Sequence, residues 1–209
     1  EDFERAANND QQLGILSAYQ QLSSSIDLIN VVSDQLLEEW QMSRPDIVIA
    51  DFITLSGGLV ANQLGIPFTI HAGEAAGAEN VQQAINLGAS RIGHGIRAVE
   101  SEQVMSDLAI KHIAVEMCPC SNLQTKAIDN LKNYPLRTFL QKGIMATLNT
   151  DNMTVSQTEI KQEFELLESD YQLTEFEAKK LLNNAINASF LSIEDKIALK
   201  TYINMKGID

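Results

Sequence analysis

The chain opens with a long amphipathic pattern and then alternates between short apolar runs and helical segments. Apolar residues recur at helical spacing from about Asn9 to Trp40, and the segment Ser43-Arg44-Pro45-Asp46 should end that helix. The apolar runs predict buried parallel strands at Ile47–Ala50, Pro67–Ile70, Arg91–Gly93, Ile113–Met117 and Ile144–Leu148. The intervals predict helices at Ser56–Leu64, Glu79–Leu87, Ser101–Lys111 and Pro135–Lys142, with stops at Gly65, Gly88 and Gly143. This alternation indicates βαβ units and a parallel sheet.

The last part of the chain predicts helices alone. Ser156-x-x-Glu159 and Thr174-x-x-Glu177 match the capping-box pattern of a helix start, and Ser192-Ile193-Glu194-Asp195 is a third such start. We therefore expect an α/β protein of parallel βα units with a helical C-terminus.

Composition limits the classes of partner. The 209 residues include 44% hydrophobic ones, enough for an ordinary core, and the formal net charge is -13. Such an acidic chain should repel nucleic acid and anionic membranes, and no apolar stretch approaches the roughly 20 residues of a membrane helix. The N-terminus does not have the pattern of a signal peptide. Cys118 and Cys120, separated by one proline, are poorly placed for a disulfide and favour a reducing, cytoplasmic compartment.

Polar residues cluster where three predicted strands end, as they do in the catalytic ring of a parallel α/β protein. His71 can offer an imidazole to a divalent metal, and Asp151 can offer a carboxylate. Glu74 could move a proton, and His94, whose flanking glycines should leave its ring uncrowded, could orient an attacking hydroxide. These residues predict amidohydrolase chemistry such as hydrolytic deamination.

Structural roles also fit each of these residues. A strand-end histidine can be a satisfied core residue, and Glu74 can be a helix-start residue. Asp151-Asn152 can be a helix-entry turn, and His112 should cap a helix.

Longer stretches of the chain resemble adenosine deaminase, especially the bacterial members. From Gly65 to about Glu194, the matching segments are Gly65-Ile66-Pro67-Phe68-Thr69-Ile70-His71-Ala72-Gly73-Glu74-Ala75-Ala76-Gly77, Arg91-Ile92-Gly93-His94-Gly95-Ile96, Glu116-Met117-Cys118-Pro119, Ser121-Asn122-Leu123-Gln124-Thr125, Leu148-Asn149-Thr150-Asp151-Asn152 and Ala188-Ser189-Phe190-Leu191. The resemblance implies a zinc-dependent (βα)8 barrel of the TIM type that converts adenosine to inosine and ammonia. It covers about two thirds of the chain.

The resemblance also implies a role for each candidate residue. His71 and Asp151 would bind zinc, Glu74 would protonate the purine, and His94 would position the attacking hydroxide. Gly73 and Asn152 would contact the purine nucleoside, with Asn152 standing where many members have a second aspartate.

The sequence departs from the family in two ways. It has no His-x-His strand, which supplies two further zinc ligands in the family, so we expect an incomplete zinc site. Residues 1–64, with Arg44-Pro45-Asp46-Ile47-Val48-Ile49-Ala50-Asp51-Phe52, resemble instead the N-terminal part of a nucleotide-sugar glycosyltransferase. We therefore expect a helix plus βα segment over 1–64, fused to an adenosine-deaminase-like half barrel over 65–209.

The five or six strands predicted are too few for the eight of a closed barrel. Three outcomes follow: the N-terminal strand covers one edge and makes an open, doubly wound sheet; two chains pair through exposed edges into a homo-oligomer; or the product folds poorly.

Three functions remain open from the sequence. The first is a zinc-dependent purine nucleoside deaminase. The second is a catalytically inactive fusion or purine-binding remnant, since zinc sites normally have three or four protein ligands. The third is a role in glycosyl transfer.

Overall fold

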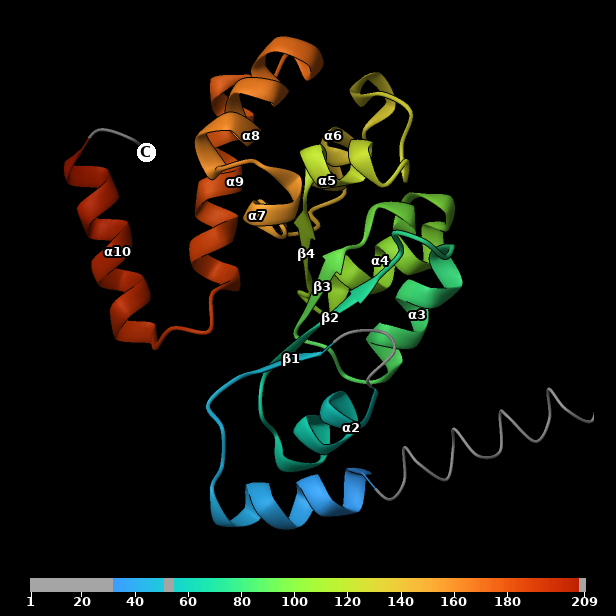
Figure 1. The fold of residues 1–209 in the computed structure, drawn as a ribbon. Coiled ribbons are helices and arrows are strands. Elements are labelled where there is room, and N and C mark those ends of the chain that lie inside the picture. Colours follow the sequence, from blue (N-terminus) through green and yellow to red (C-terminus); the bar gives the residue numbers. More distant parts are fainter. Residues whose placement is uncertain (1–31, 51–54, 207–209) are drawn as a thin grey trace, which may run out of the picture.

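A computed structural model describes residues 32–50 and 55–206 of the chain (Figure 1). The strands are β1 (Val48–Ala50), β2 (Phe68–Ala72), β3 (Arg91–His94), β4 (Ala114–Met117) and β5 (Ala146–Leu148). The helices are α2 (Leu55–Leu64), α3 (Ala78–Asn86), α4 (Glu102–Ile110), α5 (Pro119–Gln124), α6 (Leu136–Gln141), α7 (Met153–Ser156), α8 (Ile160–Leu166), α9 (Glu175–Ala188) and α10 (Ile193–Met205). Short turns of helix lie at η1 (Ile96–Glu100), η2 (Leu131–Asn133) and η3 (Leu167–Tyr171).

The five strands form one parallel sheet in the order β1-β2-β3-β4-β5. The sheet confirms the α/β prediction, and β1 covers the edge of β2. The doubly wound outcome is wrong, because each strand pairs with the next strand in the chain and the order never reverses. Right-handed crossovers between consecutive neighbours place their helices on the same face, as in an arc of a barrel. Accordingly, α3 and α4 lie side by side on one flank of the sheet (Figure 1).

The two faces of the sheet differ in polarity because side chains alternate along each strand. Phe68 and Ile70 of β2 are buried in the apolar core, together with Ile92 and Val115 of the next strands. The alternate positions are polar, and they include Thr69, His71, Arg91, Glu116 and Thr147. The prediction of wholly apolar buried strands is therefore too simple, since one face carries polar groups.

Contacts within the sheet satisfy much of this polar face. Nε of Arg91 lies 2.8 Å from Oε1 of Glu116, and the hydroxyl of Thr69 donates to Oε2 of the same carboxylate. The ring of Phe190, which follows α9, covers the guanidinium at 3.9 Å from the ring centroid. The segment after α9 thus covers one part of the face opposite the helices.

β1 is an edge strand and departs from the prediction of a fully buried one. Val48 is 8% exposed, whereas Ile49 is 77% exposed. The side chain of Val48 packs in the core, while its neighbour points to the other face of the sheet, where nothing described covers it.

The N-terminal helix prediction falls mostly on residues that the structure leaves undescribed. Residues 1–31 lie outside the described part, and residues 32–42 are helical up to the predicted break at Ser43. The predicted helix ends are confirmed, because Gly65, Gly88 and Gly143 have φ of 63°, 88° and 76°.

Two of the three predicted helix starts are confirmed. Thr174 and Glu177 form a capping box at α9, and Ser192 caps α10. The prediction at Ser156 is wrong: Ser156 ends α7, and α8 begins three residues later than expected. Glu159 takes the capping position instead, and its backbone N–H donates to Oε1 of Gln162 at 2.9 Å.

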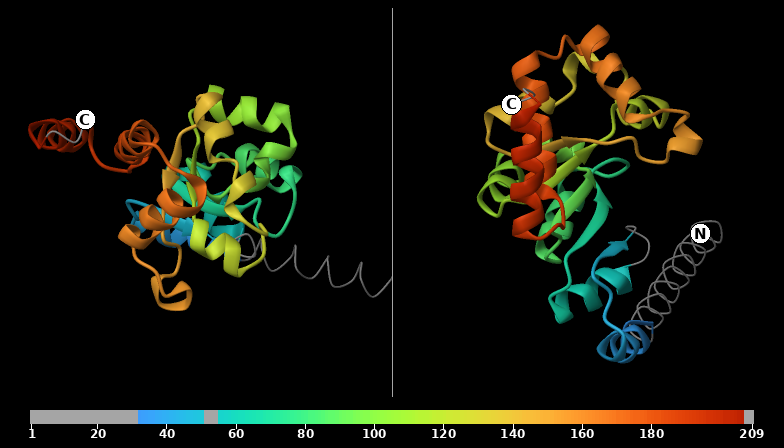
Figure 2. Two further views of the ribbon diagram at one scale, coloured as in Figure 1. Left: turned by 90° about the horizontal axis from the view of Figure 1, so that it is seen from above. Right: turned by 90° about the vertical axis from the view of Figure 1, so that its left-hand side faces the viewer.

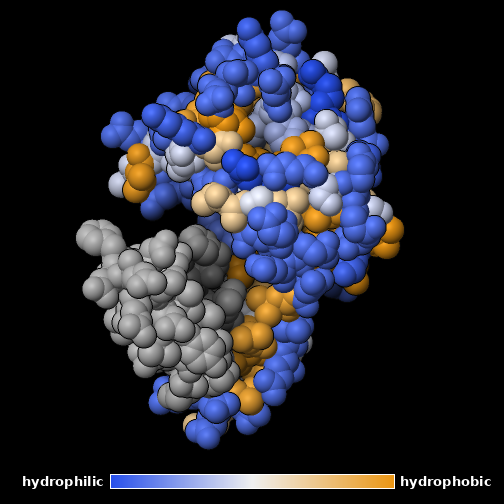
Figure 3. Space-filling view, turned by 90° about the vertical axis from the view of Figure 1, so that its right-hand side faces the viewer, coloured by the Kyte–Doolittle hydropathy of each residue, from blue (hydrophilic) through white to orange (hydrophobic). Residues whose placement is uncertain are grey.

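Of the last two helices, α9 packs on the sheet and α10 lies outside it. α9 packs against β5 and α6, and α10 contacts α9 without burying any residue (Figure 2). On the face shown in Figure 3, hydrophilic groups predominate, and apolar groups gather toward the end that holds α2. None of the described helices is long and apolar enough to cross a bilayer.

The ion pair between Arg137 and Glu177 predicts a pH-dependent stability. The hydrogen bond that the Arg137 guanidinium donates to Glu177 lowers the pKa of the Glu177 carboxyl to about 2. An unfolded glutamate titrates near pH ~4.3, so the pair stabilises the fold above that pH and loses its effect as the pH falls toward 2. Glu177→Gln should lower the free energy of unfolding by about 2 kcal/mol at pH 7, measured by urea denaturation.

The difference between wild type and Glu177→Gln should shrink below pH ~4.3 and vanish near pH ~2. Glu175→Gln is the matched control, since Glu175 lies on the same helix turn, is 83% exposed and pairs with Lys179 at 3.2 Å. It should change stability by less than about 0.5 kcal/mol. A Glu177→Gln effect that stays constant from pH 7 to 2 would contradict the assignment.

Candidate active site

The candidate site lies at the C-terminal ends of the strands. His71 belongs to β2, His94 ends β3, and Asp151 follows β5 by three residues. In the register of β2 and β3, Ala72 pairs with His94 and His71 with Gly93. The two imidazole rings are consequently close, with their centroids 5.1 Å apart.

Three side chains at this edge could hold a metal ion. One ligand atom each from His71, His94 and Asp151 lies within 4.8 Å of the others. Two imidazoles and a carboxylate are the donors that catalytic zinc sites use, so the donor chemistry fits zinc. The sequence predicted His71 and Asp151 as ligands, and the structure adds His94 as a third candidate by distance.

Glu74 reaches the same cluster from the loop after β2. Its Oε2 lies 3.4 Å from Nε2 of His94, while Oδ2 of Asp151 lies 4.0 Å from that nitrogen. The four residues with predicted metal or catalytic roles are thus brought together around one imidazole.

His94 is deeply buried, with 1% of its surface exposed. Burial, the dominant effect, lowers the pKa of its imidazole, against the opposing attraction of the Glu74 carboxylate. The prediction of an uncrowded His94 ring is wrong, because the ring is buried. The flanking glycines instead leave room for the neighbouring side chains. A Cβ at Gly93 would lie 3.2 Å from the His71 ring, and one at Gly95 would lie 2.6 Å from Val115.

Backbone strain marks two of the site residues. His94 and Asp151 have φ of 61° and 57°, in the left-handed region that side chains with a Cβ rarely occupy. Strained residues of this kind cluster at functional sites, where the surrounding structure holds them in place.

The two predicted purine contacts take part in local hydrogen bonds. The N–H of Gly73 donates to Asn80, and its carbonyl accepts from the N–H of Arg97. Oδ1 of Asn152 accepts from the backbone N–H groups of Thr154 and Val155 and so caps α7. The helix-entry role of this turn is therefore real for Asn152, whatever its side-chain NH2 contacts.

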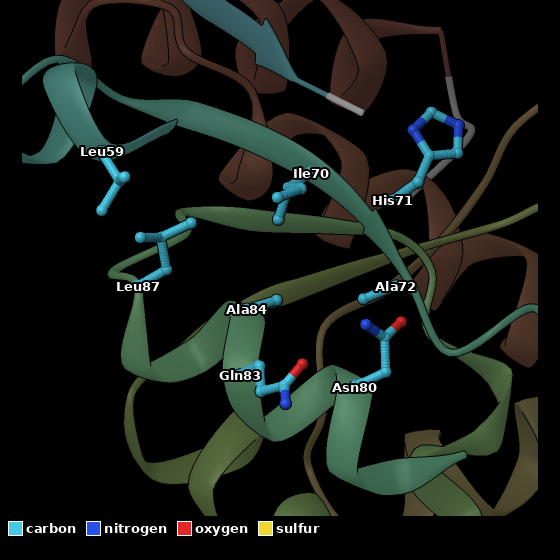
Figure 4. Close-up of a pocket in the computed structure, with 8 residues that line it drawn as sticks. All are labelled: Leu59, Ile70, His71, Ala72, Asn80, Gln83, Ala84 and Leu87. Carbon is cyan, nitrogen blue, oxygen red and sulfur yellow. The ribbon is translucent and has the colours of Figure 1, made fainter. Parts of the chain in front are cut away.

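A cavity of about 230 Å³ opens beside His71, His94 and Asp151. It is lined by His71, Gly93, His94, Glu116, Cys118, Asn149, Thr150 and Asp151. A larger, mainly apolar cavity of about 360 Å³ lies on the other side of β2, between α2 and α3. His71 lines both cavities, and in Figure 4 its ring lies across the strand from Asn80 and Gln83. His94 and Asp151 line only the smaller cavity, so the chemistry belongs there.

The sequence analysis included the residues that hold this cluster in a segment matching the family, but it gave them no role. Ser121 donates to Asp151 at 2.7 Å, Nδ2 of Asn122 lies 3.0 Å from Nδ1 of His94, and Thr125 donates to Glu74 at 2.9 Å. All three come from α5 or the residue after it. The available signal was a run of hydrogen-bonding side chains just after a strand end and a proline.

The two cysteines are free, as predicted. Cys118 is buried at the cavity, and burial raises the pKa of its thiol, reinforced by the charge of Asp151. Its thiol donates to the Glu116 carbonyl, so it behaves as a protonated, packed group.

The comparisons with known proteins agree with this geometry. A family model described as adenosine deaminase matches residues 58–206. The chain belongs to the adenosine deaminase family. Relatives include the adenosine deaminases of Haemophilus ducreyi, 65% identical over 146 residues, and Enterococcus faecalis, 43% identical over 145 residues. They match 70% and 69% of this chain and 42% and 43% of their own lengths, so the chain spans less than half of either relative.

Solved structures of deaminases and amidohydrolases share the fold. Adenine deaminase from Arthrobacter aurescens has a TM-score of 0.77 at 25% identity, over 87% of this chain and 58% of its own. An amidohydrolase from Burkholderia ambifaria, solved with bound Zn, has a TM-score of 0.69 at 20% identity, over 81% and 51%. Arabidopsis ADAL, solved with IMP, has a TM-score of 0.69 at 21% identity, over 87% and 54%.

These matches correct one expectation. The family model already includes residues 58–64, and the Arthrobacter structure covers 87% of this chain. The glycosyltransferase resemblance predicted for residues 1–64 is not borne out. A Gly-Ile-Pro segment between a helix and a short apolar strand suits many parallel α/β proteins, which explains the misleading similarity.

Gly93 offers a direct test of how the His71 ring is held. Gly93→Ala places a methyl group 3.2 Å from Cγ of His71 and should displace the imidazole toward the cavity. We expect zinc affinity to fall about tenfold, with little change in melting temperature, by chelator competition and thermal denaturation. Gly57→Ala is the control, since its methyl would make an ordinary 3.6 Å contact with Val48. Unchanged zinc affinity in Gly93→Ala would contradict this role for Gly93.

Proposed function

We propose that this site performs the zinc-dependent hydrolytic deamination of adenosine to inosine and ammonia. The observation that carries the proposal is the convergence of His71, His94 and Asp151 on one cavity at the C-terminal edge of the sheet, with the Glu74 carboxylate 3.4 Å from Nε2 of His94. Membership of the adenosine deaminase family supports the reaction class. The proposal concerns the residues that this chain provides.

His71 and Asp151 would hold the zinc ion. Imidazole nitrogen and carboxylate oxygen are both established zinc ligands, and the Ser121 hydroxyl orients the Asp151 carboxylate at 2.7 Å. A bound zinc ion would supply Lewis acidity and would lower the pKa of a water molecule to about 7, so that the water could lose its proton at neutral pH. The zinc-bound amidohydrolase from Burkholderia supports a metal of this kind in the shared fold.

Glu74 would carry the proton that the reaction moves. Thr125 holds Oε1 of its carboxyl at 2.9 Å, and Oε2 faces His94 across 3.4 Å. The Glu74 carboxyl would protonate a purine ring nitrogen, and the resulting carboxylate would take a proton from the water whose hydroxide adds to the ring carbon that bears the amino group. The proton of the added hydroxyl would then pass to the amino group, which leaves as ammonia while the ring carbon becomes a carbonyl. The His94 imidazole would orient the attacking water through Nε2, which faces Glu74.

A purine ligand suits the remaining groups. Gly73 and Asn152 border the cluster, and the side-chain amide of Asn152 can hydrogen-bond a purine edge. ADAL from Arabidopsis, solved with IMP, shares the fold and supports a purine in this class of site. We propose a purine nucleoside as the small-molecule partner.

A catalytically inactive purine-binding remnant is the second candidate. It is favoured by the absence of a His-x-His motif from the sequence, which has three histidines in all. Catalytic zinc sites have three protein ligands as a rule, and the described residues offer His94 as the third by distance. Further ligands could come from a second copy, since β1 and β5 end the described sheet.

Deaminase activity tests the role of Glu74. The purified chain with zinc should convert adenosine to inosine, which an assay of ammonia release measures. Glu74→Gln should lower kcat at least about a hundredfold while zinc stays bound. Glu79→Gln, an exposed carboxylate at the start of α3, is the control and should keep full activity. Full activity in Glu74→Gln would exclude it as the proton carrier. Adenosine binding without turnover in wild type would favour the inactive remnant.

Zinc content per chain tests the metal site. Close to one zinc per chain in protein purified without added metal would mean that another residue or a second copy completes the site, and Asp151→Ala should then remove the zinc. Asp107→Ala is the control, because Asp107 lies in α4 and bonds glutamine side chains instead. Stoichiometric zinc in Asp151→Ala would contradict its role as a ligand, and a metal-free wild type would favour the inactive remnant.

A further inference from the structure

We propose that Asn122, oriented by Tyr134, is a positioning residue that holds His94 in the tautomer with its proton on Nε2. The inference rests on the proposed function for its catalytic meaning, since it says how His94 is prepared for its part in deamination. It also separates His94 from the metal ligands, although the distances alone would place it among them.

The contact of Asn122 with His94 is buried and direct. Asn122 has no exposed surface, and its Nδ2 lies 3.0 Å from Nδ1 of His94. An amide NH2 group can donate a hydrogen bond and cannot accept one. If NH2 faces the ring, Nδ1 must therefore be the acceptor and carry no proton.

Tyr134 decides which end of the amide faces the ring. The phenol hydroxyl donates to Oδ1 of Asn122 at 3.0 Å, and Tyr134 is 3% exposed. Turning the amide over would place NH2 against the phenol and leave the phenol proton without this acceptor. An unsatisfied buried donor costs on the order of 1–3 kcal/mol, which favours the orientation observed.

The consequence for His94 is a fixed direction of its one N–H group. A neutral imidazole that accepts at Nδ1 carries its proton on Nε2. Nε2 lies 3.4 Å from Glu74 and 4.0 Å from Asp151, so the N–H points to the carboxylates around the cavity. Neither ring nitrogen then keeps a lone pair for a metal ion, because Nδ1 accepts from Asn122 and Nε2 is protonated.

This arrangement divides the three candidate ligands by chemistry. His71 and Asp151 remain available to a metal, and His94 becomes a hydrogen-bond donor to an oxygen or a carboxylate in the cavity. Tyr134 is itself braced, since its ring packs edge to face on Tyr171 with centroids 6.3 Å apart. A positioning residue needs such a rigid support to hold its partner in one geometry.

The tautomer can be read from the ring nitrogens directly. The chain has three histidines, so nitrogen NMR of 15N-histidine-labelled protein gives three imidazole patterns. His71→Gln and His112→Gln variants assign two of them, and the third is His94. Near pH ~8, above the usual imidazole pKa, wild-type His94 should show a protonated Nε2 and an unprotonated Nδ1.

Tyr134→Phe is the decisive variant, because it removes only the hydroxyl that orients Asn122. The amide can then turn over, and His94 should become a mixture of both tautomers. The kcat of Tyr134→Phe should fall about tenfold or more with KM little changed, as when a residue that orients a catalytic group is removed. Tyr171→Phe is the matched control: it removes a neighbouring buried phenol hydroxyl, which accepts from the N–H of Arg137. It should leave the His94 spectrum unchanged.

Asn122→Asp offers the opposite result. A carboxylate can only accept, so it should draw the proton to Nδ1 and reverse the tautomer. If this buried carboxylate prevents folding, the Tyr134→Phe spectrum decides alone. Wild-type His94 protonated at Nδ1, or a Tyr134→Phe spectrum identical to wild type, would overturn the proposal.

The spectra need neither zinc nor substrate, so they separate the two proposals. A chain without deaminase activity that still shows the expected tautomers would overturn the proposed function and support the positioning by Asn122. An active chain with the wrong tautomer would do the reverse.

Discussion

The parallel pairing of β2 with β3 is the constraint on which the site depends. Because Ala72 pairs with His94, the loop that begins at Gly73 and the turn at Gly95 leave the sheet side by side. The backbone N–H of Gly95 donates to the carbonyl of Ala72, which ties the two strand ends together. A shift of one residue would send the His71 side chain to the apolar face and remove it from the cavity.

Most of the hydrogen bonds that hold the site side chains come from α5 and the residue after it. This short helix and the residue after it contact Asp151, His94 and Glu74 through Ser121, Asn122 and Thr125. Its N-terminal end is anchored by Glu163, which is fully buried and accepts from the N–H of Cys120. Burial raises the pKa of the Glu163 carboxyl, against the effect of that hydrogen bond. One rigid element therefore sets the relative positions of three reactive groups.

The sheet has one apolar face and one polar face, and the polar side chains have partners that offset the free-energy cost of their burial. The face toward the helices is apolar and supplies most of the buried core. The opposite face carries the ion pair of Arg91 with Glu116 and the hydroxyls of Thr69 and Thr147, each with a partner. A buried polar group with a hydrogen-bonding partner costs little free energy. A buried polar group without one would destabilise the sheet by an amount on the order of several kcal/mol.

The sequence by itself determined the five strands and the longer helices in their order along the chain, the helix ends at Gly65, Gly88 and Gly143, and the caps at Thr174 and Ser192. These follow from local rules, because periodicity, turn residues and capping groups act within a few residues. It also singled out His71, Glu74, His94 and Asp151 as reactive. It did not predict the short helices α5 and α7. Only the tertiary structure decided the consecutive strand order, the exposure of Ile49, the burial of His94 and the roles of Asn122 and Tyr134. Those depend on contacts such as the one between His94 and Asn122, 28 residues apart, for which local patterns carry no signal.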